Sequence, residues 1–569
     1  MERDFDILIK GGTIYDGLGN PGKALDVAVR NDKIKALAAD IDPAKASRVI
    51  DARGMAVAPG FIDPHSHTDI ELLVNPRGES KIRQGVTTEI GGNCGFTLFP
   101  VSYRNWEEKR GYCDKKYGVP LTWRTMSEFL EHLEYRGISL NYATLIGHST
   151  VRECVFGLQD RPPTPEEMAA MKNLVREDME KGALGISSGL IYIPGCYADR
   201  NELIELCRVA AAYGGVYTTH MRNEADQLAE AVEEAITIAS EARISLQISH
   251  LKLAYPRNWS KIHWVLSRIS EVKAQGMEIL ADRYPYTATS TVLSAFLPPW
   301  IQEGTTSEFL NRLLDPALEG KIREYIKAQE EKVGSWDNVF ISSVLGKENE
   351  RLVGKSIREA SEEARKEPYL FIRDLLVAEE NQVWMINFSL NEDNFKRIIQ
   401  HPLVVIGSDG WARAPYGPLG RDKPHPRSYG TFPRMLGRYV REEKIMTLEQ
   451  AIAKMTSLTA RKFGLYGRGI LREGFFADCV VFDPDRVIDR ATWTEPHRYP
   501  EGIPYVLVNG VSVVFDPDRV IDRATWTEPH RYPEGIPYVL VNGVLVVFEG
   551  EHTGATPGRI LRKNHGLSI

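Results

Sequence analysis

Two histidines one residue apart, His65 and His67 in the stretch FIDPHSHTD, have the type and spacing of metal ligands. On a β-strand, side chains two positions apart point to the same side and lie about 6–7 Å apart along the strand. Both imidazoles could therefore reach one zinc ion at the usual Zn–N distance of about 2.0–2.1 Å. The pair alone fits equally well with two polar residues that end a strand, so the rest of the chain has to decide.

Four further residues of ligand type come at or just after the end of other short apolar segments. They are Cys94, His220, His250 and Asp409. Taken singly, each has an ordinary structural explanation: a hydrogen-bonded core histidine, a helix-capping aspartate or a small buried cysteine. Together with the first pair they make six nitrogen, sulfur and oxygen ligands that suit zinc. One open tetrahedral catalytic site uses fewer, so two ions could be held, with the thiolate touching both.

The elements that must position these residues are short apolar segments that alternate with helical stretches from residue 59 onward. The strand candidates are 55–62, 86–92, 139–147, 183–188, 215–220, 243–250, 277–282, 382–388 and 403–408. Such alternation predicts an α/β fold, a (β/α)8 TIM-like barrel with helices outside. Nine candidates compete for eight places, and we expect 382–388 to lie outside the barrel. Barrel enzymes hold their active sites at the carboxyl ends of the strands, where all six ligand-type residues fall.

The two ends of the chain have a different pattern, with short strands and turn signals such as Gly11-Gly12. We expect residues 1–58 and 468–569 to form one small composite β-sandwich beside the barrel of residues 59–467. A charged, mostly helical stretch at 295–350 interrupts the alternation and predicts an inserted subdomain or lid.

The C-terminal part contains an exact tandem repeat. Residues 480–511 recur without change at 513–544. Structural repeat families drift in sequence, and two copies do not make a solenoid. We interpret the repeat as a recent in-frame duplication of 33 residues or an artefact of sequence assembly, and we expect one copy to be surplus to the sandwich.

Composition narrows the class of partner. The net charge of −7 gives no basic footprint for nucleic acid, and no apolar run approaches the ~20 residues that span a bilayer. The first residues lack the pattern of a signal peptide. Six cysteines occur without a CxxC pair, which is typical of a reducing compartment. We therefore expect a cytoplasmic protein that acts on a small molecule, and the sequence leaves its oligomeric state open.

Several motifs resemble the D-aminoacylase (N-acyl-D-amino-acid deacylase) branch of the amidohydrolase superfamily. They include GNCGFTLFP, SSGLIYIPG, THMRNE, ISHLK and GSDG. In that branch a cysteine replaces the carbamylated lysine that bridges two metals in dihydroorotases and hydantoinases. The fourth strand here, ALGISSGLIY, has no lysine, and Cys94 matches the family cysteine.

The resemblance implies roles for named residues. A tightly held Zn²⁺ would be bound by Cys94, His220 and His250, and a weaker second site would use His65, His67 and Asp409. The α-carboxylate of the substrate would be held by residues matching Tyr192, Lys252 and Arg427. The segment between Asp409 and Arg427 is longer than usual for the branch, which makes Arg427 the least secure of these matches.

The implied reaction is zinc-dependent hydrolysis of N-acyl-D-amino acids. Zinc would supply hydroxide near neutral pH, and Asp409 would take the proton from water and pass it to the departing nitrogen. Residues 287–300, where relatives that prefer acidic substrates carry a basic residue, contain no Arg or Lys. We therefore expect neutral or apolar side chains on the substrate. The alternatives are a dipeptidase for D-amino-acid peptides, a cyclic amidohydrolase and a non-catalytic scaffold.

Overall fold

The computed structural model describes residues 3–514, 538–541, 544–548, 551–552 and 556–563. Its centre is built from parallel strands in two sheets. The first sheet is ordered β10-β9-β8 and the second β11-β12-β13-β14-β15-β19. These strands are β8 (Phe61–Asp63), β9 (Val86–Gly91), β10 (Asn141–Thr144), β11 (Ile146–Gly147), β12 (Gly185–Gly189), β13 (Val216–His220), β14 (Ser245–Ile248), β15 (Ile279–Arg283) and β19 (Val404–Ile406). The fold is mixed α/β, as the alternating pattern predicts.

Backbone contacts join the two sheets at both edges. On one side Leu145 donates its N–H to the carbonyl of Gly91, at 3.1 Å, next to the break between β10 and β11. On the other side the segments that follow β8 and β19 run parallel, with an isolated bridge between Ser66 and Gly410. The His67 N–H donates to the carbonyl of Gly410 at 3.0 Å there.

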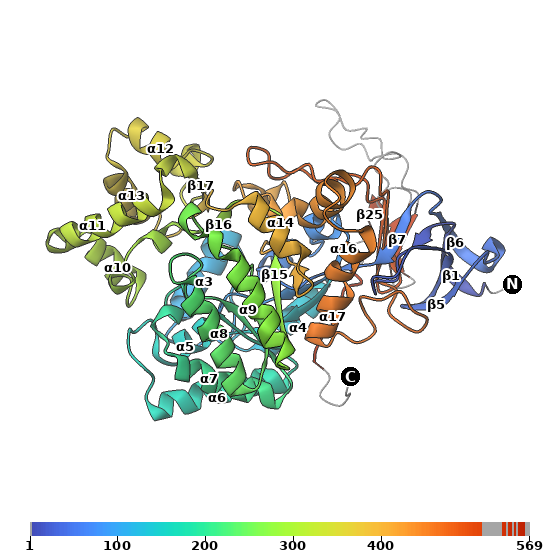
Figure 1. Cartoon of the computed structure of the whole chain (residues 1–569), viewed down its shortest axis with the longest axis horizontal. Helices are drawn as coiled ribbons and strands as arrows, with labels where there is room; N and C mark the ends of the chain where they lie inside the picture. Colours follow the sequence, from blue (N-terminus) through green and yellow to red (C-terminus); the bar gives the residue numbers. More distant parts are fainter. Residues whose placement is uncertain (1–2, 515–537, 542–543, 549–550, 553–555, 564–569) are drawn as a thin grey trace.

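Helices cover the outside of these sheets (Figure 1). They include α6 (Pro165–Glu180), α7 (Arg200–Ala212), α8 (Leu228–Ala242), α9 (Ile262–Ala274) and α14 (Glu392–Gln400). Helix α8 shows why the sequence forms them: its buried residues Leu228, Val232 and Ala235 recur every three or four positions and make one apolar face. Helix α6 begins with a capping box between Thr164 and Glu167.

The expected strand 55–62 is divided into two strands that belong to different sheets. β7 (Ala56–Pro59) pairs antiparallel with β20 (Cys479–Phe482), whereas β8 pairs parallel with β9. Gly60 separates them, and a Cβ atom there would lie 2.2 Å from Oγ1 of Thr87. A side chain here would collide with Thr87, so glycine is required where the chain passes from one sheet to the other.

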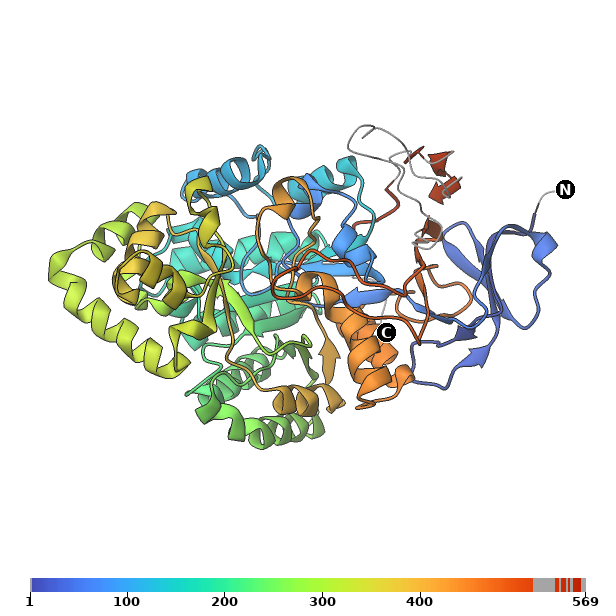
Figure 2. The same cartoon turned by 90° about the horizontal axis from the view of Figure 1, so that it is seen from above.

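A separate unit follows β15 and lies at the end of the molecule away from the N-terminus (Figures 1 and 2). Strand β18 (Trp384–Asn387) pairs antiparallel with β16 (Thr289–Val292) and β17 (Val339–Ser343), so the segment 382–388 lies outside the parallel sheets, as expected. Its helices are α10 (Thr306–Leu313), α11 (Pro316–Val333), α12 (Ile357–Glu363) and α13 (Pro368–Ala378). The unit has its own apolar cluster, which runs from Leu293 to Met385.

Segments from both chain ends share a six-stranded sheet, ordered β22-β21-β20-β7-β2-β3. Here β2 is Thr13–Ile14, β3 Lys23–Ala24, β21 Tyr505–Val508 and β22 Val511–Val514. A four-stranded sheet, β5-β4-β1-β6, shares an apolar cluster with it that includes Ile9, Val27, Val57 and Val481. The strands of the four-stranded sheet are β1 (Phe5–Lys10), β4 (Asp26–Arg30), β5 (Lys33–Ala38) and β6 (Ala46–Asp51).

The first repeat copy supplies nearly all of β20 and β21, whereas most of the second copy, 513–544, lies outside the described residues. Its described backbone includes β23 (Tyr538–Val541), which pairs antiparallel with β24 (Val544–Phe548), as β21 pairs with β22. Strand β25 (Glu551–His552) completes that small sheet.

The remaining helices are α1 (Glu71–Val74), α2 (Glu79–Ile82), α3 (Trp106–Gly111), α4 (Met126–Arg136), α5 (His148–Phe156), α15 (Arg427–Arg434), α16 (Leu448–Met455) and α17 (Ser457–Phe463). Across the described part of the chain, every helix is too short or too polar to cross a membrane.

Candidate metal centre

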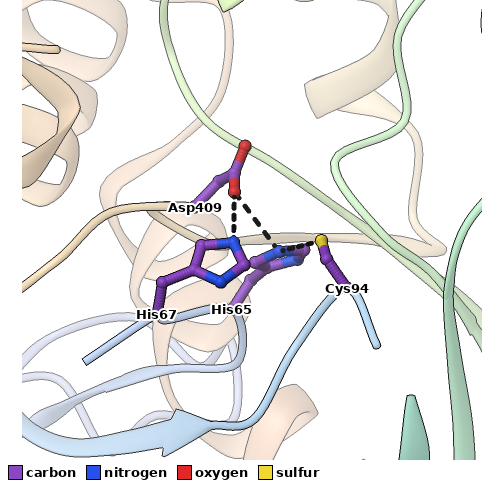
Figure 3. Close-up of side chains that lie close together, drawn as sticks. All are labelled: His65, His67, Cys94 and Asp409. Atoms are coloured by element: carbon purple, nitrogen blue, oxygen red, sulfur yellow. Dashed lines mark hydrogen bonds and ion pairs between the residues drawn. The ribbon is translucent and has the colours of Figure 1, made fainter. Parts of the chain in front are cut away.

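All six predicted ligand residues meet at the carboxyl ends of the parallel strands. Their ligand atoms form two overlapping groups, and within each group all of these atoms lie within 4.8 Å of one another. The first group is His65, His67, Cys94 and Asp409 (Figure 3), and the second is Cys94, His220 and His250. Cys94 belongs to both groups, so its sulfur lies where a thiolate could touch two ions.

Three of the ligand positions adopt a left-handed backbone conformation, which is uncommon for residues other than glycine. The φ angles are 53° at Cys94, 36° at His250 and 50° at Asp409. Each residue comes just after its strand ends, where this conformation turns the side chain away from the course of the strand. Such geometry costs of order 1–3 kcal/mol per residue and is concentrated at functional sites.

The distances within the two groups are short. The Sγ of Cys94 lies 3.4 Å from Nε2 of His65 and 3.5 Å from Nε2 of His250. The Oδ1 of Asp409 lies 3.0 Å from Nε2 of His67 and 3.4 Å from Nε2 of His65, as Figure 3 shows.

His220 provides the test of whether these residues fit a metal. Both of its ring nitrogens are buried, and neither makes a hydrogen bond with the described residues; the nearest carboxylate is that of Glu224, 3.5 Å from Nε2. Its ring centroid lies 4.3 Å from that of His250. A buried polar atom without a partner is costly, and coordination would remove that cost. Thiolate and imidazole are also the ligands that zinc prefers, so the residues fit zinc.

Electrostatics favour the ligating forms of the anionic residues. Burial by itself raises the pKa of the Cys94 thiol, but the neighbouring imidazoles of His65 and His250 outweigh it and hold that pKa well below its ordinary value. Burial likewise raises the pKa of Asp409, and the guanidinium of Arg427 with the nearby imidazoles reverses this, so its pKa lies well below the usual range. Both shifts favour the anionic form of the group, which is the form that binds a metal.

Two buried carboxylates orient the imidazoles. The Nδ1 of His65 lies 3.0 Å from Oδ1 of Asp282, which also accepts the backbone N–H of His250 at 2.8 Å. Glu224 lies 3.0 Å from Nδ1 of His250 and 3.5 Å from Nε2 of His220. When Nδ1 of His65 donates to Asp282, its Nε2 is left free as a ligand.

Asp282 and Glu224 were not among the predicted site residues. Asp282 ends the expected strand 277–282, as the predicted ligands end theirs, and Glu224 is the last residue of THMRNE. Strand-end position was therefore a usable signal for Asp282, whereas Glu224 lies in a connecting loop.

The three residues expected to bind a carboxylate surround this centre. The Nζ of Lys252 lies 2.5 Å from Oε1 of Glu224. The ring of Tyr192 lies 4.9 Å from that of His220. The Nη1 of Arg427 donates to Oδ2 of Asp409 at 2.6 Å, and its side chain is 1% exposed. The cations of Lys252 and Arg427 and the phenol of Tyr192 thus lie next to the candidate ligands or to Glu224, which contacts them.

Comparison with known proteins identifies the family to which the chain belongs. The model of the amidohydrolase family matches residues 48–332 and 379–547. The chain belongs to the amidohydrolase family. This amidohydrolase is 37% identical over 509 residues to the D-aminoacylase of Alcaligenes xylosoxydans xylosoxydans, with 90% of this chain and 94% of that one aligned. It is 35% identical to the N-acyl-D-glutamate deacylase of the same organism, with 90% and 94% aligned.

A solved structure extends the likeness to three dimensions. The N-acyl-D-glutamate deacylase from Bordetella bronchiseptica, complexed with zinc and a phosphonate that mimics the tetrahedral intermediate, superimposes with a TM-score of 0.77 at 33% identity. The match covers 98% of this chain and 99% of that one.

Proposed function

We propose that this amidohydrolase hydrolyses the amide bond of N-acyl-D-amino acids in a zinc-dependent reaction, to give a carboxylate and a free D-amino acid. The observation that carries the proposal is the convergence of Cys94, His220 and His250, whose ligand atoms lie within 4.8 Å of one another, beside the buried Asp409–Arg427 pair. The activities named for the two curated relatives and the zinc-bound structural neighbour support it.

Cys94, His220 and His250 would hold the tighter zinc, and His65, His67 and Asp409 would hold a weaker second ion. When bound, zinc lowers the pKa of a coordinated water to about 7 and polarises a carbonyl group. Asp282 and Glu224 keep the imidazoles oriented for that role.

Asp409 is proposed as the proton carrier. Arg427 holds its Oδ2, while its Oδ1 faces His67 and His65. The carboxylate would accept a proton from the attacking water and return it to the departing amide nitrogen, which is otherwise a poor leaving group.

Lys252, Tyr192 and Arg427 are proposed to bind the substrate α-carboxylate. Glu224 holds Lys252 beside the candidate ligand histidines, and the planar guanidinium of Arg427 can donate two parallel hydrogen bonds to a carboxylate. This clamp would place the amide next to the centre with the amino acid end fixed.

For the fold, we propose that β8, β9, β10 with β11, β12 to β15, and β19 close into one eight-stranded barrel over residues 59–467. The hydrogen bond between Leu145 and Gly91 and the bridge between Ser66 and Gly410 support closure. We also propose that residues 1–58 and 468–569 form a composite β-sandwich, supported by the sheet that contains both chain ends.

The inserted unit predicted at 295–350 is proposed to be the larger one whose apolar cluster spans 293–385. A cytoplasmic location is proposed as well, because all six cysteines, each in the described part of the chain, are free thiols.

The test is an assay of N-acetyl-D- and N-acetyl-L-amino acids, a D-dipeptide and a hydantoin, with and without a chelator, alongside a zinc measurement. We expect deacylation of the D-amino acid derivatives, loss on chelation and recovery with zinc. Chelator-resistant activity, or turnover restricted to the cyclic imide, would contradict the proposal.

A further inference from the structure

A small cavity beside the metal centre contains a buried cation without a matching partner. The cavity is about 20 Å³, enough for one water-sized group. Its wall includes Lys116, Ser290, Ser343, Trp384, Trp411 and Arg413. Arg413 is 6% exposed, and its Nε and Nη1 have no hydrogen-bond partner among the described residues. A buried guanidinium with unsatisfied donors is costly unless an anion completes it.

The groups around the cavity keep unused hydrogen-bond donors. Asp422 is the carboxylate on the wall, and its Oδ2 lies 4.0 Å from Nη1 of Arg413, at the limit of an ion pair. Lys116 forms no ion pair with the described residues, and burial lowers its pKa. Lys116 and Arg413 thus face Asp422, and Glu71 is a second buried carboxylate near both cations. The buried hydroxyl of Ser343 also lacks a partner in the described part of the chain. All three unsatisfied groups can donate to an anion.

Backbone hydrogen bonds fix this wall to the metal centre. Ala412 donates its N–H to Oγ1 of Thr68 at 2.7 Å, and Arg413 donates its N–H to Oγ of Ser80 at 2.8 Å. The Trp411 ring lies 5.5 Å from the ring of His67. These contacts hold the cavity wall against the segment that contains His65 and His67.

Strand β16 joins the cavity to the carboxylate clamp. The carbonyl of Ser290, on the cavity wall, accepts from Nη2 of Arg427 at 3.5 Å. The next residue, Thr291, donates to the hydroxyl of Tyr192 at 3.0 Å. A substrate held by the clamp would therefore have the cavity next to it.

We propose that this cavity is a subsite for a second carboxylate of the substrate, separate from the α-carboxylate. The inference rests on the proposed deacylase function and refines its substrate class. Residues 287–300 contain no Arg or Lys, and on that ground a neutral substrate side chain is expected from the sequence. The cations at this cavity come instead from other segments, as Lys116 and Arg413. The second carboxylate could end the amino acid side chain or the acyl chain.

The test measures kcat/KM for three substrates: N-acetyl-D-leucine, N-acetyl-D-glutamate and N-succinyl-D-leucine. We expect one of the two dicarboxylates to be preferred over N-acetyl-D-leucine. In Arg413→Gln and in Lys116→Gln, the ratio of kcat/KM for that dicarboxylate to kcat/KM for N-acetyl-D-leucine should fall by about 10- to 100-fold, the worth of a hydrogen bond to a charged group. The preferred dicarboxylate identifies which end of the substrate enters the subsite.

Lys115→Gln is the matched control, because Lys115 is exposed and pairs with Glu380 at 3.1 Å. It should leave the ratio unchanged, and Arg413→Lys should retain part of it. If Arg413→Gln does not fold, Lys116→Gln still decides, since Lys116 lies at the cavity edge. Turnover of N-acetyl-D-leucine without any advantage for a dicarboxylate would overturn the subsite alone. Absence of turnover with all three substrates would overturn the deacylase function as well.

Discussion

Replacing Asp409 by Asn tests the proposed proton carrier while leaving the shape of the site almost unchanged. The substitution removes the charge that lies 3.0 Å from His67 and 2.6 Å from Arg427. General acid–base catalysis is typically worth 10²–10⁴-fold, or about 3–5 kcal/mol of barrier, so kcat should fall by that amount. Arg427 loses its carboxylate partner and becomes freer to bind the substrate, so KM should not rise.

The assay combines steady-state kinetics with zinc analysis of the purified variant. The tighter site does not include Asp409, so zinc at Cys94, His220 and His250 should be retained. A thermal melt checks folding, because an unpaired buried guanidinium can cost about 3–5 kcal/mol. Asp226→Asn is the control, since Asp226 pairs with Arg257 at the surface. A folded Asp409→Asn variant with near-normal kcat would refute the assigned role.

Four further predictions concern residues around the site and the fold. Glu224→Gln should raise KM more than it lowers kcat, because Nζ of Lys252 loses the charged carboxylate oxygen that lies 2.5 Å from it. An equal loss of zinc and of all activity would instead indicate a purely structural role. Burial, with a smaller effect of a neighbouring glutamate, raises the pKa of Asp178 to about 7 from 3.8. The folded state therefore binds its proton more tightly, and stability falls as pH rises from about 4 to 7, by up to about 4 kcal/mol. Asp178→Asn should thus raise the melting temperature more at pH 8 than at pH 4, and equal shifts would contradict this. Deleting one 33-residue repeat unit should leave activity intact, and a folded but inactive product would oppose that view. The ring of Trp493, in the first repeat copy, lies 4.8 Å from the ring of His425, and Nδ1 of His425 accepts the backbone N–H of Arg427. Trp493→Ala should therefore lower activity. Trp526→Ala, the equivalent change in the second copy, should not.

The convergence of the six candidate ligand residues was predictable because strand-end position is a property of local sequence. His65, His67 and Cys94 each follow a short apolar run, and parallel strands bring such ends together wherever they lie in the chain. Asp409 follows His67 by 342 residues, and the two side chains nevertheless lie 3.0 Å apart.

Other features depend on packing that no local pattern records. The segment 55–62 reads as one strand, and only the close approach of Gly60 to Thr87 shows why it divides between two sheets. The cations of the proposed subsite, Lys116 and Arg413, come from the π-helical segment Tyr112–Tyr117 and from the long segment after Asp409. Neither has a spacing that indicates a shared cavity, so a substrate preference read from 287–300 alone missed them.

The most direct test of the metal centre is the zinc content of the purified protein and of two cysteine variants, measured together with deacylase activity. We expect about one tightly held zinc per chain in the unaltered protein and in Cys207→Ala, a buried cysteine outside the site. Cys94→Ala should lose both zinc and activity, because it removes the thiolate shared by the two ligand groups. A Cys94→Ala protein that keeps stoichiometric zinc and full turnover would contradict the account.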